Sequence, residues 1–369
     1  MTFAIRIHEY GGPEKMIWEE LPRPEPKPGE ARIRQEAVGL NYIDVYFRTG
    51  LYKAPSLPAI IGMEGAGVVD AVGEGVTEVS VGDRVAYASG PIGAYAQSRC
   101  LKADRLVKIP EGISSETAAA MMLQGMTAQY LLHSTYPVRA GQTILVHAAA
   151  GGVGLILCQW AKHLGCTVIG TVSTPEKAAL AKAHGADHVV LTSEDLPAAV
   201  KRITGGAGVP VSYDSVGRDT FMPSLDSLAP RGMLVSYGNA SGPVTPFDLG
   251  ILAAKGSLYV VRPTLNTYTA THADLTACAA SLFEVVLSGA VKINVNQRYA
   301  LKDAAQAHSD LEARKTTGST ILIPRMARGP WFSPPGSPPD PSPRRGQPGW
   351  RHRPGYPSHW PRSCGECGA

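Results

Sequence analysis

Short apolar runs separated by Gly and Pro fill the first third of the chain. Runs such as Ala31–Ile33, Gly67–Val72 and Arg84–Ala88 have the length of strands, and turn residues lie between them. Pro recurs through Arg23–Gly29, which indicates a rigid extended connector. The pattern predicts a β-rich region over residues 3–125.

From about Ala118 the pattern changes, because apolar positions recur at the spacing of a helix over Glu116–Leu132. Strands and helices then alternate. The predicted strands are Thr143–His147, Thr167–Val172, His188–Leu191, Val211–Asp214 and Met233–Tyr237. The predicted helices are one that follows a Gly-rich turn and ends at Leu164, then Pro175–His184, Leu196–Ile203 and Phe221–Leu228. Such alternation is typical of a doubly wound parallel sheet, so we predict an α/β fold.

The patterned sequence closes with two predicted helices, Asp274–Ser288 and Lys302–Leu311, and a strand, Ser319–Ile323. We expect this last part to pack back on the β-rich region. The predicted domains are residues 1–125 with 298–324, residues 126–297, and a tail. The tail, residues 325–369, is rich in Pro and Arg and has no apolar periodicity, so we expect it to be disordered.

Charge and hydrophobicity exclude several classes of protein. No apolar run approaches the roughly 18–20 residues that cross a bilayer, and charged residues interrupt the first ten positions, so we expect a cytoplasmic protein without membrane contact. The net charge is +4, but residues 325–369 hold seven Arg and two acidic residues. The rest has 28 basic and 29 acidic residues and gives no argument for nucleic-acid binding.

The cysteines do not form a spaced cluster. Four of the six are scattered through the body and are expected to be buried thiols, which fits a reducing compartment. The tail carries Cys364-Gly-Glu-Cys367 without a second ligand pair, so neither a redox motif nor a metal site is expected there.

The strongest local signal for function is the stretch Val146–Gly154, which reads VHAAAGGVG. It follows a predicted strand and opens a helix, as a dinucleotide-binding turn does. Gly151 and Gly152 lack a Cβ atom, so a pyrophosphate is expected to approach their backbone, and Gly154 is expected to let the helix pack on the sheet. The helix start supplies free N–H groups and partial positive charge. Ala149 stands where a first Gly is usual.

The end of the second strand indicates which nicotinamide cofactor binds. NAD-binding proteins place an acidic residue there to hold the ribose hydroxyls, but this strand ends at Val172 and continues Ser173-Thr174-Pro175-Glu176-Lys177. Thr174 is expected to cap the next helix. Two hydroxyls, a helix start and Lys177 form an anion site that suits a 2′-phosphate, so we favour NADPH. Two alternatives stay open: Lys177 as a solvated lysine, and Glu176 on the ribose.

Several further stretches resemble the medium-chain dehydrogenase/reductase family. The hallmark is GMEGAGVV at residues 62–69 followed by VGDRV at residues 81–85. The stretches that resemble its quinone oxidoreductase, zeta-crystallin-like branch are NYIDVY at 41–46, RTGLY at 48–52, the glycine-rich turn, and DSVGRD at 214–219. The similarity runs over residues 3–324. It implies a GroES-like catalytic domain, a Rossmann-type domain that binds NADPH, and a homodimer built by sheet continuation.

The same stretches argue against zinc. Zinc-dependent members of the family carry His where this chain has Met63, and Cys in the loop that here reads Asn41-Tyr42-Ile43-Asp44. They also carry a run of four closely spaced Cys, which this chain lacks. Zinc needs about four N, S or O ligands, and Met63 is no substitute for His. We therefore expect no metal.

The resemblance also implies the site residues. For catalysis or substrate contact these are Asn41, Tyr46, Tyr52 and Thr127. For the cofactor they are Tyr42, Ile43, Asp44, Tyr46, Tyr130, Gly151, Gly152, Val153, Gly154, Ser173, Thr174, Lys177, Ser215, Tyr237, Gly238, Asn239, Pro263, Thr264, Leu265 and Arg314. Ordinary packing for the tyrosines and a surface position for Arg314 are the plain alternatives. Where relatives carry a Tyr near the adenine, this chain reads Leu191-Thr192-Ser193, so stacking there is not expected.

The predicted activity is reduction of a quinone by NADPH without a metal. Quinone reduction yields a hydroquinone anion whose charge resembles that of a phenolate, with a pKa of about 10, so little electrophilic help is needed. The first alternative is reduction of an activated C=C bond in an enone or alkenal, where a positioned acid such as Tyr46 or Tyr52 becomes essential. The second is a non-enzymatic structural or RNA-binding role, which the charge of the body disfavours.

Overall fold

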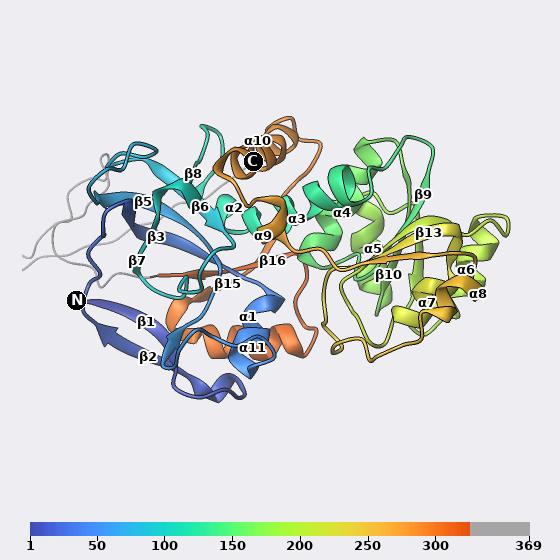
Figure 1. Cartoon of the computed structure of the whole chain (residues 1–369), viewed down its shortest axis with the longest axis horizontal. Coiled ribbons are helices and arrows are strands. Elements are labelled where there is room, and N and C mark those ends of the chain that lie inside the picture. The colour runs from blue at the N-terminus through green and yellow to red at the C-terminus, as the bar shows by residue number, and fades with distance from the viewer. Residues whose placement is uncertain (325–369) are drawn as a thin grey trace, which may run out of the picture. The chain divides into compact units, whose positions relative to one another are not determined.

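The computed structural model describes residues 1–324, and the expectations for residues 325–369, the Cys364/Cys367 pair included, lie outside them. Three sheets and eleven α-helices make up the described part (Figure 1). The helices are α1 (Tyr42–Thr49), α2 (Ser115–Ala119), α3 (Met122–Tyr130), α4 (Gly152–His163), α5 (Pro175–Ala183), α6 (Leu196–Ile203), α7 (Phe221–Asp226), α8 (Gly250–Ala254), α9 (Leu265–Tyr268), α10 (His272–Leu287) and α11 (Ala304–Glu312).

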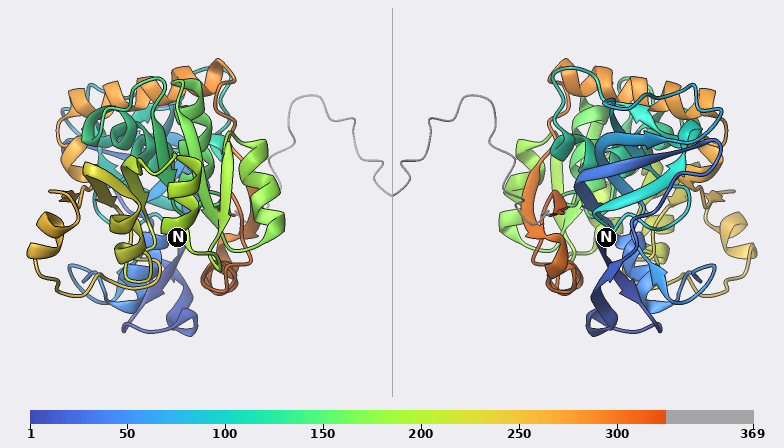
Figure 2. Two further views of the ribbon diagram at one scale, coloured as in Figure 1. Left: turned by 90° about the vertical axis from the view of Figure 1, so that its right-hand side faces the viewer. Right: turned by 90° about the vertical axis from the view of Figure 1, so that its left-hand side faces the viewer.

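The six-stranded sheet is parallel throughout, in the order β11-β10-β9-β12-β13-β14. Its strands are β9 (Thr143–Val146), β10 (Thr167–Val172), β11 (His188–Leu191), β12 (Val209–Asp214), β13 (Leu228–Ser236) and β14 (Tyr259–Val261). Helices cover both faces (Figure 2). Ile144 packs into the core that holds α4 and α10, while Leu145 packs into the core that holds α6 and α7. The predicted α/β fold with a doubly wound sheet is confirmed.

The β-rich part forms two sheets. A seven-stranded sheet runs β15-β16-β3-β5-β6-β8, with β7 also paired to β3, and a three-stranded sheet runs β2-β1-β4. The strands are β1 (Thr2–Ile7), β2 (Met16–Leu21), β3 (Glu30–Leu40), β4 (Ala59–Ile60), β5 (Glu64–Val72), β6 (Arg84–Ala88), β7 (Ser98–Lys102), β8 (Val107–Lys108), β15 (Val295–Ala300) and β16 (Ser319–Ile323). Because β16 pairs with β3, the end of the described chain returns to the first region as predicted.

The prediction of one continuous helix over Glu116–Leu132 is wrong. The chain forms α2 and α3, separated at Ala120 and Met121, and a π-helical turn over Leu131–Thr135 follows. The Glu64 carboxylate, buried under this break, accepts a hydrogen bond from the Leu123 N–H at 2.8 Å. A tertiary contact therefore satisfies a free N–H at the start of α3, which periodicity alone does not reveal.

The stretch Asn41–Asp44, expected as a loop, also folds differently. Asn41 has an extended backbone and precedes the first turn of α1, and the Asp44 carboxylate accepts a hydrogen bond from the Asn41 N–H at 2.9 Å. An acidic side chain three residues into a helix that bonds back to the residue before it is half of a capping box. Strand β14, a short segment at the edge of the parallel sheet, was not predicted.

Candidate functional site

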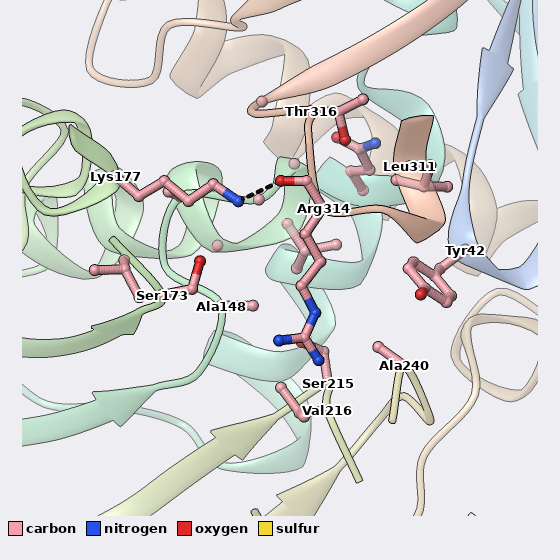
Figure 3. Close-up of a pocket in the computed structure, with 18 of the residues that line it drawn as sticks. Tyr42, Ala148, Ser173, Lys177, Ser215, Val216, Ala240, Leu311, Arg314 and Thr316 are labelled. Carbon is pink, nitrogen blue, oxygen red and sulfur yellow. Dashed lines mark hydrogen bonds between the residues drawn. The ribbon is translucent and has the colours of Figure 1, made fainter. Parts of the chain in front are cut away.

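A cavity of about 300 Å³ opens along the carboxyl end of the parallel sheet. One wall comes from the loops that follow β9, β10 and β12, and the other from the start of α1 and the segment between α11 and β16 (Figure 3). Open parallel sheets bind ligands at this edge. Eleven of the predicted residues line the cavity: Asn41, Tyr42, Gly151, Gly152, Val153, Gly154, Ser173, Lys177, Ser215, Tyr237 and Arg314.

The glycine-rich turn presents the start of α4 to the cavity. Leu155 N–H donates to the Gly151 carbonyl as an early bond of the helix, so the N–H groups of Gly152, Val153 and Gly154 lie at its open end. Within residues 1–324 no side chain caps this end, and no acidic residue lies in its first turn. Such an end attracts phosphate through its N–H groups and its partial positive charge. The residues present therefore fit a pyrophosphate.

The glycines of this turn are needed for different reasons. A Cβ atom on Gly154 would lie 2.2 Å from the Ala148 carbonyl oxygen, so Gly154 allows the helix to pack against the turn. A Cβ atom on Gly152 would lie 2.2–2.6 Å from the Gln124 carboxamide. Gly152 thus makes room for Gln124 of α3 as well as for a ligand. Ala148 adopts a φ of 50°, and the Ala149 N–H donates to the Thr171 carbonyl, so Ala149 is accommodated.

Two cations mark one end of the cavity. The Lys177 ammonium donates a hydrogen bond of 2.8 Å to the Arg314 backbone carbonyl, and the Arg314 guanidinium extends across the cavity toward Ser215 (Figure 3). Neither cation has a carboxylate partner among residues 1–324, and no Asp or Glu of that range lines the cavity. Partial burial, and then the charge of Arg314, lower the pKa of Lys177. Two cations without acidic partners in one cavity fit a ligand that carries more than one phosphate.

Of the hydroxyls near Lys177, that of Thr174 caps a helix as the sequence predicts. Thr174 caps α5, because its hydroxyl accepts a hydrogen bond of 3.3 Å from the Lys177 N–H, and Pro175 occupies the first turn. Ser173 lines the cavity beside them. Glu176 is exposed and does not line the cavity.

A buried carboxylate shapes the loop after β12. Asp214 accepts hydrogen bonds from the N–H groups of Val216 and Gly217, at 2.8 and 3.1 Å, and from the Thr220 hydroxyl. Ser215, Val216 and Thr220 all line the cavity. Asp214 therefore holds this wall in shape without facing the cavity itself.

A chain of buried polar groups lies behind the Asn41 wall. The Asn41 amide donates to Glu64 at 2.6 Å and accepts from Gln124 at 3.1 Å, and Ser319 donates to Gln124 at 2.7 Å. Burial is the largest effect on Glu64 and raises its pKa to about 8. All the partners of Asn41 in this chain are buried, so its amide is oriented by the protein and not by solvent.

The tyrosines of α1 and Tyr52, which follows the helix, reach different neighbours. Tyr42 lines the cavity. The Tyr46 hydroxyl accepts a hydrogen bond of 2.8 Å from the Asn239 N–H, and the Tyr52 hydroxyl accepts one of 3.2 Å from Arg262. The Tyr46 and Tyr52 rings pack edge-on, 5.2 Å apart. Burial raises the pKa of Tyr46 above its ordinary value. Both phenols thus contact the segment that follows β13 or β14.

The remaining predicted residues do not line the cavity. Tyr130 is buried and stacks on Tyr268, with ring centroids 4.4 Å apart, and Thr127 is buried on the same helix. Asp44 is fully buried in the core behind α1. The others outside the lining are Ile43, Tyr46, Tyr52, Thr174, Gly238, Asn239, Pro263, Thr264 and Leu265.

Sequence reasoning missed several lining residues. Thr192 follows β11 and had a usable signal, since it comes directly after a predicted strand. Gln124, Leu311 and Thr316 had none, because they reach the cavity through contacts between segments far apart in the chain. The other missed lining residues are Leu40, Ala148, Ala150, Thr171, Val172, Val216, Thr220, Ala240, Gly318 and Thr320.

Residues 1–324 contain no group of three or more His, Cys, Asp or Glu side chains that could hold a metal ion. Met63, at the position of a zinc-ligating His in the related enzymes, is buried. Within the same range no helix has both the length and the apolar character that crossing a membrane requires.

Known proteins share this architecture. Two family profiles match, the alcohol dehydrogenase GroES-like domain at residues 27–111 and the zinc-binding dehydrogenase at residues 152–278. A quinone oxidoreductase of Pseudomonas aeruginosa is 55% identical over 325 residues, which cover 88% of this chain and 100% of that protein. A 2-haloacrylate reductase of a Burkholderia species is 43% identical over 335 residues, with the same coverage.

The crystal structure of Escherichia coli quinone oxidoreductase complexed with NADPH matches with a TM-score of 0.86 at 49% identity, over 87% of this chain and 100% of that one. The chain therefore belongs to the medium-chain dehydrogenase/reductase family and, within it, to the quinone oxidoreductases. The predicted family, the GroES-like and Rossmann-type parts and the class of enzyme are confirmed.

Proposed function

We propose that this protein reduces quinones with NADPH and needs no metal ion. The observation that carries the proposal is the cavity itself, which joins an uncapped helix start to two unpaired cations, Lys177 and Arg314. This arrangement suits a dinucleotide with an extra phosphate. The relatives named for quinone reduction, one of them solved with NADPH, support the same activity.

The residue roles follow from position. The N–H groups of Gly152, Val153 and Gly154 would hold the pyrophosphate, and the side chains of Ser173, Lys177 and Arg314 the 2′-phosphate. Tyr42, Ser215 and Tyr237 line the rest of the cavity. Asn41, Tyr46, Tyr52 and Thr127 would form the acceptor end. We also propose the predicted domains, residues 1–125 with 298–324 and residues 126–297. Both contribute to the cavity, the first through Tyr42 and Arg314 and the second through Gly152 and Lys177.

Bound NADPH supplies the electrons for the reduction. The chain's own residues orient the reactants and exclude water, and orientation alone lowers a barrier considerably. A hydroquinone anion has the basicity of a phenolate, so it forms without a strong electrophile. The Tyr46 and Tyr52 hydroxyls accept hydrogen bonds from the Asn239 N–H and from Arg262, and each retains its own proton to donate. Their task is to hold the flat acceptor against α1 and to pass it a hydrogen bond.

Reduction of an activated C=C bond is the second candidate, because a 2-haloacrylate reductase is among the similar proteins. The discriminating experiment measures NADPH oxidation with 1,4-naphthoquinone and with an enone in parallel. We expect the quinone to be the better substrate by kcat/KM. A clear preference for the enone, or no turnover of any quinone, would overturn the proposal.

We also propose a cytoplasmic homodimer that forms by sheet continuation through β14. This strand ends the order of the parallel sheet and exposes Tyr259, which is 57% accessible. Light scattering after gel filtration would then give twice the chain mass of 39.0 kDa. A single-chain mass at micromolar concentration contradicts the dimer.

A further inference from the structure

A line of buried polar side chains runs behind α1, away from the cavity. Asp44 accepts a hydrogen bond of 3.0 Å from the Tyr95 hydroxyl, and the other side of that hydroxyl lies 2.9 Å from His308 Nε2. Arg48 contacts His308 Nδ1 at 3.2 Å and pairs through two 2.9 Å hydrogen bonds with Glu312. The first four of these side chains are at most 1% exposed. The line joins α1 to α11, which lie side by side (Figure 1).

From Arg48 to Asp44 the hydrogen bonds of this line all point the same way, and Arg48 donates separately to Glu312. A guanidinium only donates, so Arg48 N–H donates to His308 Nδ1, which must accept. The His308 proton then resides on Nε2 and is donated to the Tyr95 oxygen. Tyr95 has one proton left to give, and Asp44 receives it. Burial, and then the charge of Arg48, lower the pKa of His308 to about 3, so the ring stays neutral as this order requires.

The position of the Tyr95 ring is fixed by its neighbours. Its ring lies against Gly62, where a Cβ atom would come within 2.2 Å of it, and its backbone N–H donates to Ile61 at 2.9 Å. A residue with a side chain at position 62 would displace the ring. The hydroxyl between Asp44 and His308 is therefore positioned by the Ile61–Gly62 segment as well as by the two helices that it links.

Both ends of the line terminate at the cavity wall. The Asp44 oxygen that accepts from Tyr95 also accepts from the N–H of Asn41, and Asn41 and Tyr42 line the cavity. At the other end, Glu312 lies between Leu311 and Arg314, which line the opposite side. The line thus sets the spacing between the two walls of the cavity, the one at the start of α1 and the one after α11.

We propose that Asp44, Tyr95 and His308 are positioning residues, which hold the start of α1 against the cavity through this one-directional hydrogen-bond line. The proposal rests on the proposed function, because its tests measure the rate of quinone reduction. It also assigns Asp44, which the family resemblance implied as a cofactor contact, to a supporting role. Ionisable groups are costly to bury, and such networks are retained where they specify one arrangement.

Tyr95→Phe is the first test, with Tyr87→Phe as the matched control. Both phenols are fully buried in the same core, and each donates a hydrogen bond, but Tyr87 bonds Gln35 and does not reach α1. We expect Tyr95→Phe to lower kcat/KM for 1,4-naphthoquinone by about tenfold or more, since small displacements of a positioned group are costly. Tyr87→Phe should stay within about twofold of wild type at a similar loss of stability. Equal kinetic losses in both variants would overturn the proposal.

A second pair of variants, His308→Gln and His308→Leu, separates the effect of the hydrogen bonds from the effect of packing. This test does not depend on whether Tyr95→Phe folds. Gln at position 308 retains an acceptor toward Arg48 and a donor toward Tyr95, whereas Leu retains neither. We expect His308→Gln to recover most of the quinone kcat/KM that His308→Leu loses. Binding of 2′,5′-ADP, which probes the phosphate end, should change less than about threefold in either variant. Equal activity in the two variants would overturn the proposal.

The experiments distinguish failure of the proposed function from failure of the positioning proposal. If the wild-type protein does not reduce quinones with NADPH, the proposed function fails. If the wild type does so and Tyr95→Phe and His308→Leu match it, the positioning proposal alone fails.

Discussion

At the scale of single residues, Lys177 and Arg314 matter most because they lie in the cavity with no acidic partner among residues 1–324. The sequence predicted Lys177 from its place after the second strand, and the structure adds that its ammonium contacts the Arg314 backbone. The Arg314 guanidinium itself lies further along the cavity, toward Ser215 (Figure 3), so a ligand with more than one phosphate would meet both charges. Charge-assisted hydrogen bonds of this kind contribute about 1.5–3 kcal/mol.

Lys177→Ala should therefore raise KM for NADPH by about tenfold to a hundredfold, following that energy range, and leave KM for NADH within about twofold. Steady-state kinetics with 1,4-naphthoquinone measures both values. Lys182→Ala, an exposed lysine on the same helix, is the control and should change neither. Equal effects of Lys177→Ala on the two cofactors would remove the 2′-phosphate assignment.

Asp44 gives a prediction about pH. Burial is the largest effect on its carboxyl and raises the pKa from 3.8 to about 7, against the opposing hydrogen bonds from Asn41 and Tyr95. Because the folded pKa is the higher one, this group's contribution to stability is present below about pH 4 and is lost as the pH rises to about 7. Glu64, with a pKa of about 8, acts in the same direction. His308 acts in the opposite direction, because burial lowers its pKa from 6.5 to about 3 and its contribution to stability is regained as the pH rises toward 6.5. This contribution is common to wild type and an Asp44 variant.

Asp44→Asn retains an acceptor for Asn41 and Tyr95 and removes the titration. The second oxygen of Asp44 has no hydrogen-bond partner within residues 1–324, so the amide nitrogen occupies that place. Between pH 4 and pH 8 the free energy of unfolding of the variant should gain about 4 kcal/mol relative to wild type. Denaturant unfolding across that range measures it. A difference that is constant with pH contradicts the assigned pKa.

At the scale of elements, the parallel sheet was predictable because each strand of Val and Ile is followed by a helix with its own stop signal. Strand β14 was not, since it has only three residues and lies at the sheet edge. The break between α2 and α3 and the start of α1 depend on the carboxylates of Glu64 and Asp44. One of these partners is distant in sequence, and the other looks like any acidic loop residue.

The glycine-rich turn can be tested as an element. Gly154→Ala places a methyl group 2.2 Å from the Ala148 carbonyl, whereas a Cβ atom on Gly151 comes no closer than 3.2 Å to the same oxygen. We expect Gly154→Ala to lower the free energy of unfolding by about 1–3 kcal/mol, the usual cost of overpacking, and Gly151→Ala by less than about 1 kcal/mol. Urea unfolding without cofactor measures both. Similar losses would show that the turn does not depend on this close approach.

At the scale of the whole molecule, the two walls of the cavity differ in how far the sequence predicts them. Most residues of the wall that carries the glycine-rich turn are predictable, whereas only some residues of the opposite wall are. The loops after β9, β10 and β12 carry recognisable motifs, so Gly151–Gly154, Ser173 and Lys177 were found in advance. Leu311 and Thr316 reach the cavity because β16 pairs with β3 and brings the segment before it beside the glycine-rich turn, whereas Gln124 reaches the cavity from α3. That pairing joins positions nearly 300 residues apart and leaves no local signature.

The three sheets, their hydrophobic cores and the cavity all lie within residues 1–324. A chain that ends at Pro324 should therefore fold and retain kcat/KM for NADPH and quinone within about twofold of the full chain, with an unfolding midpoint within about 2 °C. Calorimetry and kinetics on the two forms make the comparison. A large loss of either property assigns residues 325–369 a part in the folded enzyme.

The most direct test of the central claim is the rate of NADPH oxidation by the full chain with 1,4-naphthoquinone, after dialysis against a metal chelator and with NADH in a parallel series. The account predicts steady turnover that the chelator does not reduce, and a kcat/KM at least about tenfold higher with NADPH than with NADH. Loss of activity on chelation, or equal use of the two cofactors, would contradict it.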